Sequence, residues 1–236
     1  MDVFLKVYDI NTSNKIRLGS KGDGGYVIGT GFGNYDCYIS AGVSDEESFS
    51  RDFINMYNMS KYNSFAFDGT ITNYPYHYTR NISFIRKNIG PTIDDNNVNL
   101  SNLIRTNDNI FLKMDIEGAE FDWLLSLKNE ELNKFKQIAI ELHGLNGDNF
   151  GCTNDKKLLC LQKLSENHYL VHAHANNYNK LINNIPDVIE LTYIRKQCFN
   201  KEPSLNKTPL PIHNLDYKNS LLYPEISLNF PPFVNN

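Results

Sequence analysis

The sequence of 236 residues predicts one α/β domain built on a mostly parallel, seven-stranded sheet with helices on both faces. Two observations support this prediction. Short apolar runs typical of strands alternate with amphipathic runs typical of helices over most of the chain. The last two strand-like runs, 168–177 and 187–196, are joined by a turn too short for the crossover that parallel strands need. We therefore expect an antiparallel final strand.

The elements are expected in the following order. Residues 1–35 precede the first convincing strand and are interpreted as an N-terminal hairpin and cap. Strands are expected at 36–42, 63–69, 79–90, 109–116, 136–144, 168–177 and 187–196, and helices at 44–57, 99–105, about 117–128 and 155–167. Ser44 and Glu47 have the spacing of a capping box at the first helix. Because six of the nine prolines lie from Pro203 onward, residues 199–236 are expected to form an irregular tail packed on the domain 1–198.

Composition narrows the class of protein. No apolar run reaches 18 residues, so no membrane span is expected, and the N-terminus lacks the apolar run of a secretory signal. A net charge of -4 argues against a protein that binds nucleic acid by neutralising phosphates. The four cysteines form no C-x-x-C pair, which argues against zinc fingers and redox motifs and favours a reduced, cytoplasmic protein.

Two glycine-containing stretches are candidates for nucleotide binding. Residues 19–33 are richest in glycine, but a dinucleotide fingerprint must follow a strand and open a helix, and this stretch does neither. Its glycines serve turns, or Asp23, Gly25 and Tyr26 line one side of a cofactor pocket. The better candidate is "YISAGVSDEESF" (38–49), which follows a strand and opens a helix. A plain strand–turn–helix without a ligand is the alternative.

Within that second stretch, Ser40, Ala41 and Gly42 permit close approach of a ligand to the backbone. Asp68 ends the next strand and is followed in the sequence by Gly69. An acidic side chain at this position accepts hydrogen bonds from ribose hydroxyls. These five residues are the predicted centre of the cofactor site.

Carboxylates gather in "IFLKMDIEGAEFDWL" (110–124), where an apolar strand gives way to a helix. Helix capping accounts for Glu117 or Glu120, but less well for Asp115 at the strand rim. Glu141 and His143 alternate on the following strand and point to one face. Asp115, Glu141 and His143 are therefore expected to converge and to suit Mg²⁺ or Mn²⁺. A hydrogen-bonded polar cluster without metal is the alternative.

Two further histidines, His172 and His174, alternate on the strand 168–177. Neutral imidazole titrates near physiological pH, so either is a candidate general base, as is His143 if it is not a metal ligand. Packing of these rings at the sheet end is the alternative.

The segment "FLKMDIEGAEFDWL" resembles the K-x-D-x-E-G-x-E motif of the FkbM-type methyltransferase family, and Lys113, Asp115, Glu117, Gly118 and Glu120 all match. The order of "RLGSKGDGGYVIG", "ISAGVSDEESF", "FDGT", "IELHG" and "HANN" also resembles that family. The resemblance implies a class I, Rossmann-like methyltransferase fold and S-adenosylmethionine as cofactor. It implies that Ser40, Ala41 and Gly42 contact the amino-acid part of the cofactor, and Asp68 the ribose.

The resemblance also implies an acceptor, since relatives often methylate hydroxyl groups of sugars or polyketides. The expected function is O-methylation of a sugar hydroxyl, on a nucleotide-linked sugar or a surface-polysaccharide precursor. In the expected mechanism, a metal held by Asp115, Glu141 and His143 binds two neighbouring hydroxyls of the acceptor and lowers the pKa of the reacting one. His172, His174 or, if it is not a ligand, His143 removes the proton. Asp115 is also expected to contact the cofactor, and the tail and the loop 145–155 are expected to shape the acceptor pocket. Methylation of another small molecule or of RNA, and a catalytically silent binding module, are the alternatives. No membrane partner is expected, and a homodimer is left open.

Overall fold

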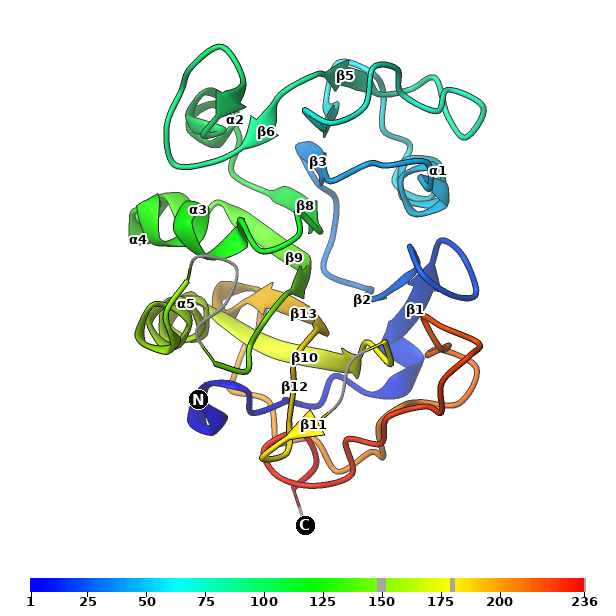
Figure 1. Ribbon diagram of the computed structural model, residues 1–236, viewed down its shortest axis with the longest axis vertical. Helices are drawn as coiled ribbons and strands as arrows, with labels where there is room; N and C mark the ends of the chain where they lie inside the picture. The colour runs from blue at the N-terminus through cyan, green and yellow to red at the C-terminus, as the bar shows by residue number, and fades with distance from the viewer. Residues whose placement is uncertain (148–151, 179–180, 236) are drawn as a thin grey trace.

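Seven strands form one central sheet in the computed structural model, which describes residues 1–147, 152–178 and 181–235 (Figure 1). Across the sheet the strands lie in the order β10, β13, β9, β8, β3, β4, β5. Their bounds are Cys37–Ala41 (β3), Ser64–Phe67 (β4), Ser83–Ile85 (β5), Ile110–Met114 (β8), Phe135–Leu142 (β9), His168–Ala175 (β10) and Ile189–Arg195 (β13). The predicted α/β fold with a mostly parallel seven-stranded sheet is confirmed. β13 runs antiparallel to both of its neighbours, β9 and β10.

Helices cover one face of the sheet, and a helix and a hairpin cover the other (Figure 1). The helices are Ser48–Met56 (α1), Ser101–Thr106 (α2), Glu120–Ser126 (α3), Asn129–Leu132 (α4) and Asn154–Asn167 (α5). Figure 1 shows α3, α4 and α5 on the side opposite to α1. No helix in the described ranges has both the length and the apolar character needed to cross a membrane.

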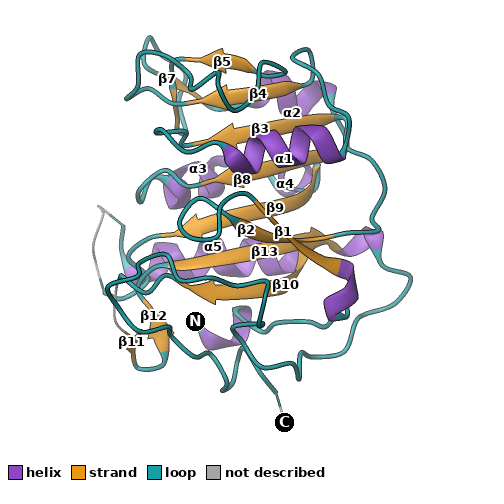
Figure 2. Ribbon diagram, turned by 90° about the vertical axis from the view of Figure 1, so that its right-hand side faces the viewer, coloured by secondary structure: helices purple, strands orange, loops and turns teal. Residues whose placement is uncertain are grey.

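The hairpin of β1 (Lys15–Leu18) and β2 (Tyr26–Gly29) lies over β9 and β13 on the face that also carries α1 (Figure 2). Every residue of β2 is buried. Polar groups of the sheet fix its position, because the Gln137 side chain bonds both the N–H and the carbonyl of Gly29, at 2.8 and 3.2 Å. A hairpin therefore takes the place of a helix over this part of the sheet.

Three smaller details differ from the expected elements. The expected strand 79–90 is divided into β5 and β6 (Asn88–Ile89), and β6 pairs with β7 (Asn97–Val98). The turn between β10 and β13 contains a small additional pair, β11 (Leu181–Ile182) and β12 (Ile185–Pro186). α1 begins at Ser48, so the predicted capping box was wrong. Ser44 instead has a φ of +49° and donates its N–H to Asp68, and Glu47 accepts a hydrogen bond from Ser40. Hydrogen bonds to Asp68 and Ser40, on other segments, therefore replace the expected cap between Ser44 and Glu47.

The tail after Cys198 forms no helix or named strand up to residue 235. Figure 1 shows it in orange and red, running past the β10 edge of the sheet and the hairpin. Buried polar groups attach it to the sheet: Nε2 of His172 on β10 lies 2.8 Å from Asp216, and Asn177 donates to the carbonyl of Ser220 at 2.8 Å. The tail is therefore held by specific hydrogen bonds as well as by apolar contact.

Replacing Asp216 with asparagine is expected to lower the free energy of unfolding by roughly 2 kcal/mol at pH 7. Burial alone would raise the pKa of Asp216, but His172 and the N–H of Ile212 outweigh it and hold the pKa at about 2, below the ordinary 3.8. A lowered carboxyl pKa stabilises the folded state above about pH 4, and this contribution disappears as pH falls toward 2.

Urea unfolding at pH 7 and pH 2.5 measures this effect. The difference between wild type and Asp216→Asn should be large at pH 7 and small at pH 2.5. Asp122→Asn is the matched control, since Asp122 is exposed and pairs only with Lys156 in the described residues. A difference that is the same at both pH values would show that ionisation of Asp216 does not stabilise the fold.

Candidate active site

A cavity of about 440 Å³ opens at the carboxyl ends of β3, β4 and β8. Four of the predicted site residues lie on its wall: Asp23, Gly42, Asp68 and Asp115. Asp23 comes from the turn of the β1–β2 hairpin, and the other three follow the three strands. Parallel strands bring the loops that follow them to one edge, where ligands bind in open α/β sheets. This cavity is therefore the candidate ligand site.

Gly42 allows the backbone segments at this edge to approach closely. Its φ is +76°, and a Cβ added there would lie 1.6 Å from the carbonyl oxygen of Asp115. Gly42 donates its N–H to Phe67 at 3.0 Å, and Asp115 donates its N–H to Ala41 at 2.9 Å. These bonds continue the sheet ladder past the strand ends. Only glycine combines this φ with so close a neighbour.

Asp68 is on the cavity wall, but the protein already uses both of its oxygens. One accepts hydrogen bonds from the N–H groups of Val43 and Ser44, each at 3.0 Å. The other accepts from the N–H and hydroxyl of Thr70 and from the N–H of Ile71. Burial would raise the pKa of Asp68, yet these bonds, Thr70 foremost, lower it. Ribose hydroxyls would have to share Asp68 with these donors.

The other predicted cofactor contacts are not on the cavity wall: Ser40, Ala41, Gly25, Tyr26 and Gly69. Two of them lie directly behind residues that are. The hydroxyl of Tyr26 donates to Asp115 at 3.2 Å, and the N–H of Gly69 donates to the side-chain oxygen of Asn88 at 3.0 Å. Their positions suit support of the wall rather than direct contact with a ligand in the cavity.

Four of the residues that line the cavity were not among the predicted cofactor, metal or catalytic residues: Asn88, Ile89, Lys113 and Glu117. Asn88 and Ile89 form the two-residue β6, which has no periodicity to detect. Lys113 did carry a signal, because a lysine inside an apolar strand is rarely buried without a partner. It is 5% exposed, and its Nζ donates to the carbonyl of Gly42 at 2.8 Å.

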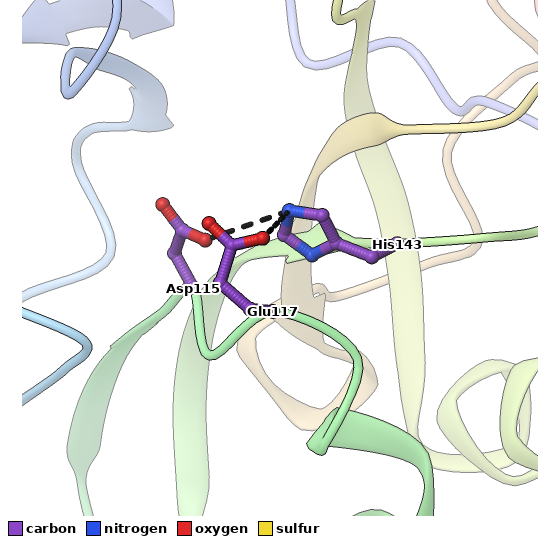
Figure 3. A group of neighbouring side chains, drawn as sticks. All are labelled: Asp115, Glu117 and His143. Atoms are coloured by element: carbon purple, nitrogen blue, oxygen red, sulfur yellow. Dashed lines mark ion pairs between the residues drawn. The ribbon is translucent and has the colours of Figure 1, made fainter. Parts of the chain in front are cut away.

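Beside the cavity, Asp115, Glu117 and His143 point toward one another (Figure 3). Nε2 of His143 lies 3.8 Å from Asp115 and 3.5 Å from Glu117. One ligand atom from each of the three residues falls within 4.8 Å of the others. Glu117 reaches this position from a turn in which its φ is +56°, a conformation that is uncommon for a non-glycine residue. The turn at Glu117 therefore carries local backbone strain.

Glu120 holds the other side of the same imidazole. It is fully buried, and one of its oxygens lies 3.3 Å from Nδ1 of His143 and accepts the N–H of Ile116 at 3.0 Å. Burial alone would lower the pKa of His143, but the bond to Glu120 and the charges of Glu141, Glu120 and Asp115 raise it to about 9. Contact of Nδ1 with Glu120 turns Nε2 toward Asp115 and Glu117.

Glu141 occupies a different position from the one expected of a metal ligand. It is 2% exposed and accepts a hydrogen bond from Asn176 at 2.7 Å. Burial, followed by the charges of Asp115 and Glu190, raises the pKa of Glu141 well above its ordinary value. The compact group of ligand atoms contains Glu117 instead of Glu141.

His172 and His174 are also placed away from the cavity wall. His172 contacts Asp216 of the tail, and His174 lies between Glu190 on β13 and Glu225 of the tail, at 3.1 and 3.3 Å. Burial would lower the pKa of His174, but these two carboxylates raise it to about 10. Both rings therefore suit attachment of the tail better than proton transfer. Part of the loop 145–155, residues 148–151, lies outside the described residues, so its role stays a prediction.

Comparison with known proteins identifies the family of this chain. A model of the FkbM methyltransferase domain matches residues 33–171, more than half of the chain. The chain belongs to the FkbM methyltransferase family. Among solved structures, a precorrin-6y C5,15-methyltransferase from Geobacter metallireducens GS-15 is similar at 11% identity and a TM-score of 0.36, over 69% of this chain and 82% of that one. No curated protein matches the chain.

Members of the FkbM family use S-adenosylmethionine, and the cavity has features that fit it. Its volume of about 440 Å³ lies in the usual range for pockets that bind small molecules. Gly42 leaves the backbone open at the carboxyl end of β3, and Asn88 and Ile89 form the wall beyond β4. The matched residues 33–171 include these segments and Asp115, whereas Asp23 lies outside them.

Proposed function

We propose that this FkbM-family chain is an O-methyltransferase that transfers a methyl group to a sugar hydroxyl, on a nucleotide-linked sugar or a surface-polysaccharide precursor. The position of Asp115 carries the proposal. It lies on the wall of the cavity and also belongs to the cluster with Glu117 and His143. A cofactor in the cavity and an acceptor at His143 would therefore be adjacent, as direct group transfer requires.

The sheet supports the finer assignment of the fold. β13, the last strand of the sheet along the chain, lies between β9 and β10 and is antiparallel to both. A mostly parallel sheet that ends in this way is the arrangement expected of a class I, Rossmann-like methyltransferase. We infer that arrangement for this chain.

In the proposed reaction, bound S-adenosylmethionine supplies an electrophilic methyl group. Asp115 accepts a hydrogen bond from the acceptor hydroxyl and orients it. His143, held through Nδ1 by Glu120, accepts the hydroxyl proton at Nε2. Since the pKa of His143 is raised to about 9, the ring must lose its own proton before it can accept the proton of the hydroxyl. The rate of methyl transfer is therefore expected to rise with pH as His143 loses this proton.

A divalent ion is the alternative occupant of the cluster. Asp115, Glu117 and His143 would hold Mg²⁺ or Mn²⁺ through two carboxylate oxygens and one imidazole nitrogen. Such an ion would supply Lewis acidity toward the acceptor hydroxyl. Carboxylates suit a sugar in either case, because they accept hydrogen bonds from hydroxyl groups. The net charge of -4 supports a small-molecule acceptor over RNA.

Calorimetry with S-adenosylhomocysteine, with Mn²⁺ and then with a chelator, tests the cofactor and the ion separately. Micromolar affinity that survives chelation is expected, since Asp23, Gly42 and Asn88 line the cavity and do not belong to the cluster. Sugar nucleotides are then screened for methyl transfer from labelled S-adenosylmethionine, each with and without Mn²⁺. Loss of transfer on chelation would assign the cluster to the ion, and retention would assign His143 as the base. Absence of cofactor binding in both conditions would refute the proposed function.

A further inference from the structure

We propose that Asn219 of the tail is a positioning residue of the cofactor site, and that it fixes Asp23 to bind the ammonium group of S-adenosylmethionine. The inference rests on the cofactor of the family and is independent of the sugar acceptor. Asn219 lies 196 residues from Asp23 in the sequence, outside the segment that the family model matches.

The side chain of Asn219 connects two carboxylates. Its Nδ2 donates to Glu190 at 2.7 Å and to Asp23 at 3.4 Å, so the two N–H bonds of the amide serve one carboxylate each. Asn219 is 9% exposed, and its Oδ1 is buried without a hydrogen-bond partner in the described residues. An amide buried in this way keeps one orientation, because reversal would place Oδ1 against two carboxylates.

The tail is anchored on both sides of Asn219. On one side, Asp216 contacts His172 at 2.8 Å. On the other, Glu225 contacts His174, whose opposite nitrogen contacts Glu190, the carboxylate that Asn219 also binds. Asn219 is therefore a fixed point relative to the sheet and not the tip of a loose loop.

Asp23 is an acidic residue on the cavity wall, and its contacts hold one of its two carboxylate oxygens. Its Oδ1 accepts from Asn219 and from the N–H of Gly24, at 3.4 and 3.1 Å, and no hydrogen bond reaches its Oδ2 within the described ranges. Asp68, by contrast, is engaged by the loops around it. Burial raises the pKa of Asp23, the bond from Asn219 opposes this, and the charges of Asp115 and Glu190 raise it further.

The charge balance indicates what Asp23 would bind. Asp23 and Asp115 both line the cavity, and the charge of Asp115 raises the pKa of Asp23, so a cation bound at Oδ2 of Asp23 relieves this repulsion. The amino-acid part of S-adenosylmethionine and of S-adenosylhomocysteine carries an ammonium group. Methylthioadenosine has the same adenosine and thioether but lacks the amino-acid part, so it reports on the rest of the cavity alone.

The test compares the dissociation constants of S-adenosylhomocysteine and methylthioadenosine by calorimetry on the full chain. Asn219→Ala is expected to weaken S-adenosylhomocysteine about fivefold, and Asp23→Asn about tenfold or more, while methylthioadenosine changes less than about twofold. Asp23→Asn keeps the shape of the side chain and tests the ammonium contact even if Asn219→Ala folds poorly.

Asn206→Ala is the matched control. Asn206 is a fully buried asparagine of the same tail that bonds Thr208 and Phe233, and it does not line the cavity. It should leave both affinities unchanged. The proposal is overturned if Asn219→Ala leaves S-adenosylhomocysteine affinity unchanged, if it weakens both ligands equally, or if Asn206→Ala has the same effect.

Discussion

Replacing Asp115 with alanine is expected to lower the rate of methyl transfer at least about 100-fold. Asp115 lines the cavity and also lies 3.8 Å from Nε2 of His143, so its loss removes the group proposed to orient the acceptor hydroxyl. S-Adenosylhomocysteine affinity is expected to stay within about fivefold of wild type, because Gly42, Asn88 and Asp23 still line the cavity. Single-turnover transfer from labelled S-adenosylmethionine and calorimetry measure the two effects.

Asp122→Ala provides the comparison for this variant. Asp122 lies on α3, seven residues after Asp115 and outside the motif, and its exposed carboxylate pairs with Lys156. This control should retain full activity. Normal turnover by Asp115→Ala would contradict both the base and the metal version of the proposed chemistry. Equal loss of turnover and of cofactor affinity would instead assign Asp115 to the cofactor alone.

Replacing Gly42 with alanine is expected to destabilise the fold by roughly 3 kcal/mol or more and to abolish cofactor binding. The new Cβ would lie 1.6 Å from the carbonyl oxygen of Asp115, which is backbone and cannot rotate away. The loops after β3 and β8 would have to separate, and the hydrogen bond from Asp115 to Ala41 would be lost with them. Urea unfolding and S-adenosylhomocysteine titration measure these losses.

Gly31→Ala separates the steric clash from the backbone conformation. Gly31 has a similar φ, +85°, but no atom lies within 4 Å of a Cβ added there. Gly31→Ala should therefore lower the free energy of unfolding by only about 1 kcal/mol, the penalty for a non-glycine residue at positive φ. If Gly42→Ala proves no more destabilising than Gly31→Ala, the close approach of the two loops is not what requires glycine at position 42.

The sequence pattern predicted the features that depend on residues close together in the chain. The strand before Asp115 was predicted at 109–116 and is observed at Ile110–Met114. A short run of apolar residues that ends at a carboxylate and a glycine is typical of a buried strand. The motif that contains Lys113, Asp115 and Glu120 is contiguous, so the family was recognisable from the sequence alone. Cofactor use follows from that family.

The partners of the polar side chains could not be predicted in the same way. His172 and His174 do alternate on one strand, as expected, but each meets a carboxylate of the tail more than 40 residues away. Likewise Glu117 takes the position beside His143 that Glu141 was expected to fill. The reason is the turn at Glu117, whose positive φ carries no signal in an Ile-Glu-Gly sequence.

The sequence by itself therefore determined the alternation of strands and helices, the edge of the sheet that carries the site, and the family. Periodicity and a contiguous motif suffice for these, since both are properties of short segments. Only the tertiary structure decided which carboxylates surround His143, that Asp68 is engaged by its own loops, and that Asn219 reaches Asp23. These contacts join segments far apart in the chain, and their geometry is set by packing that no local pattern records.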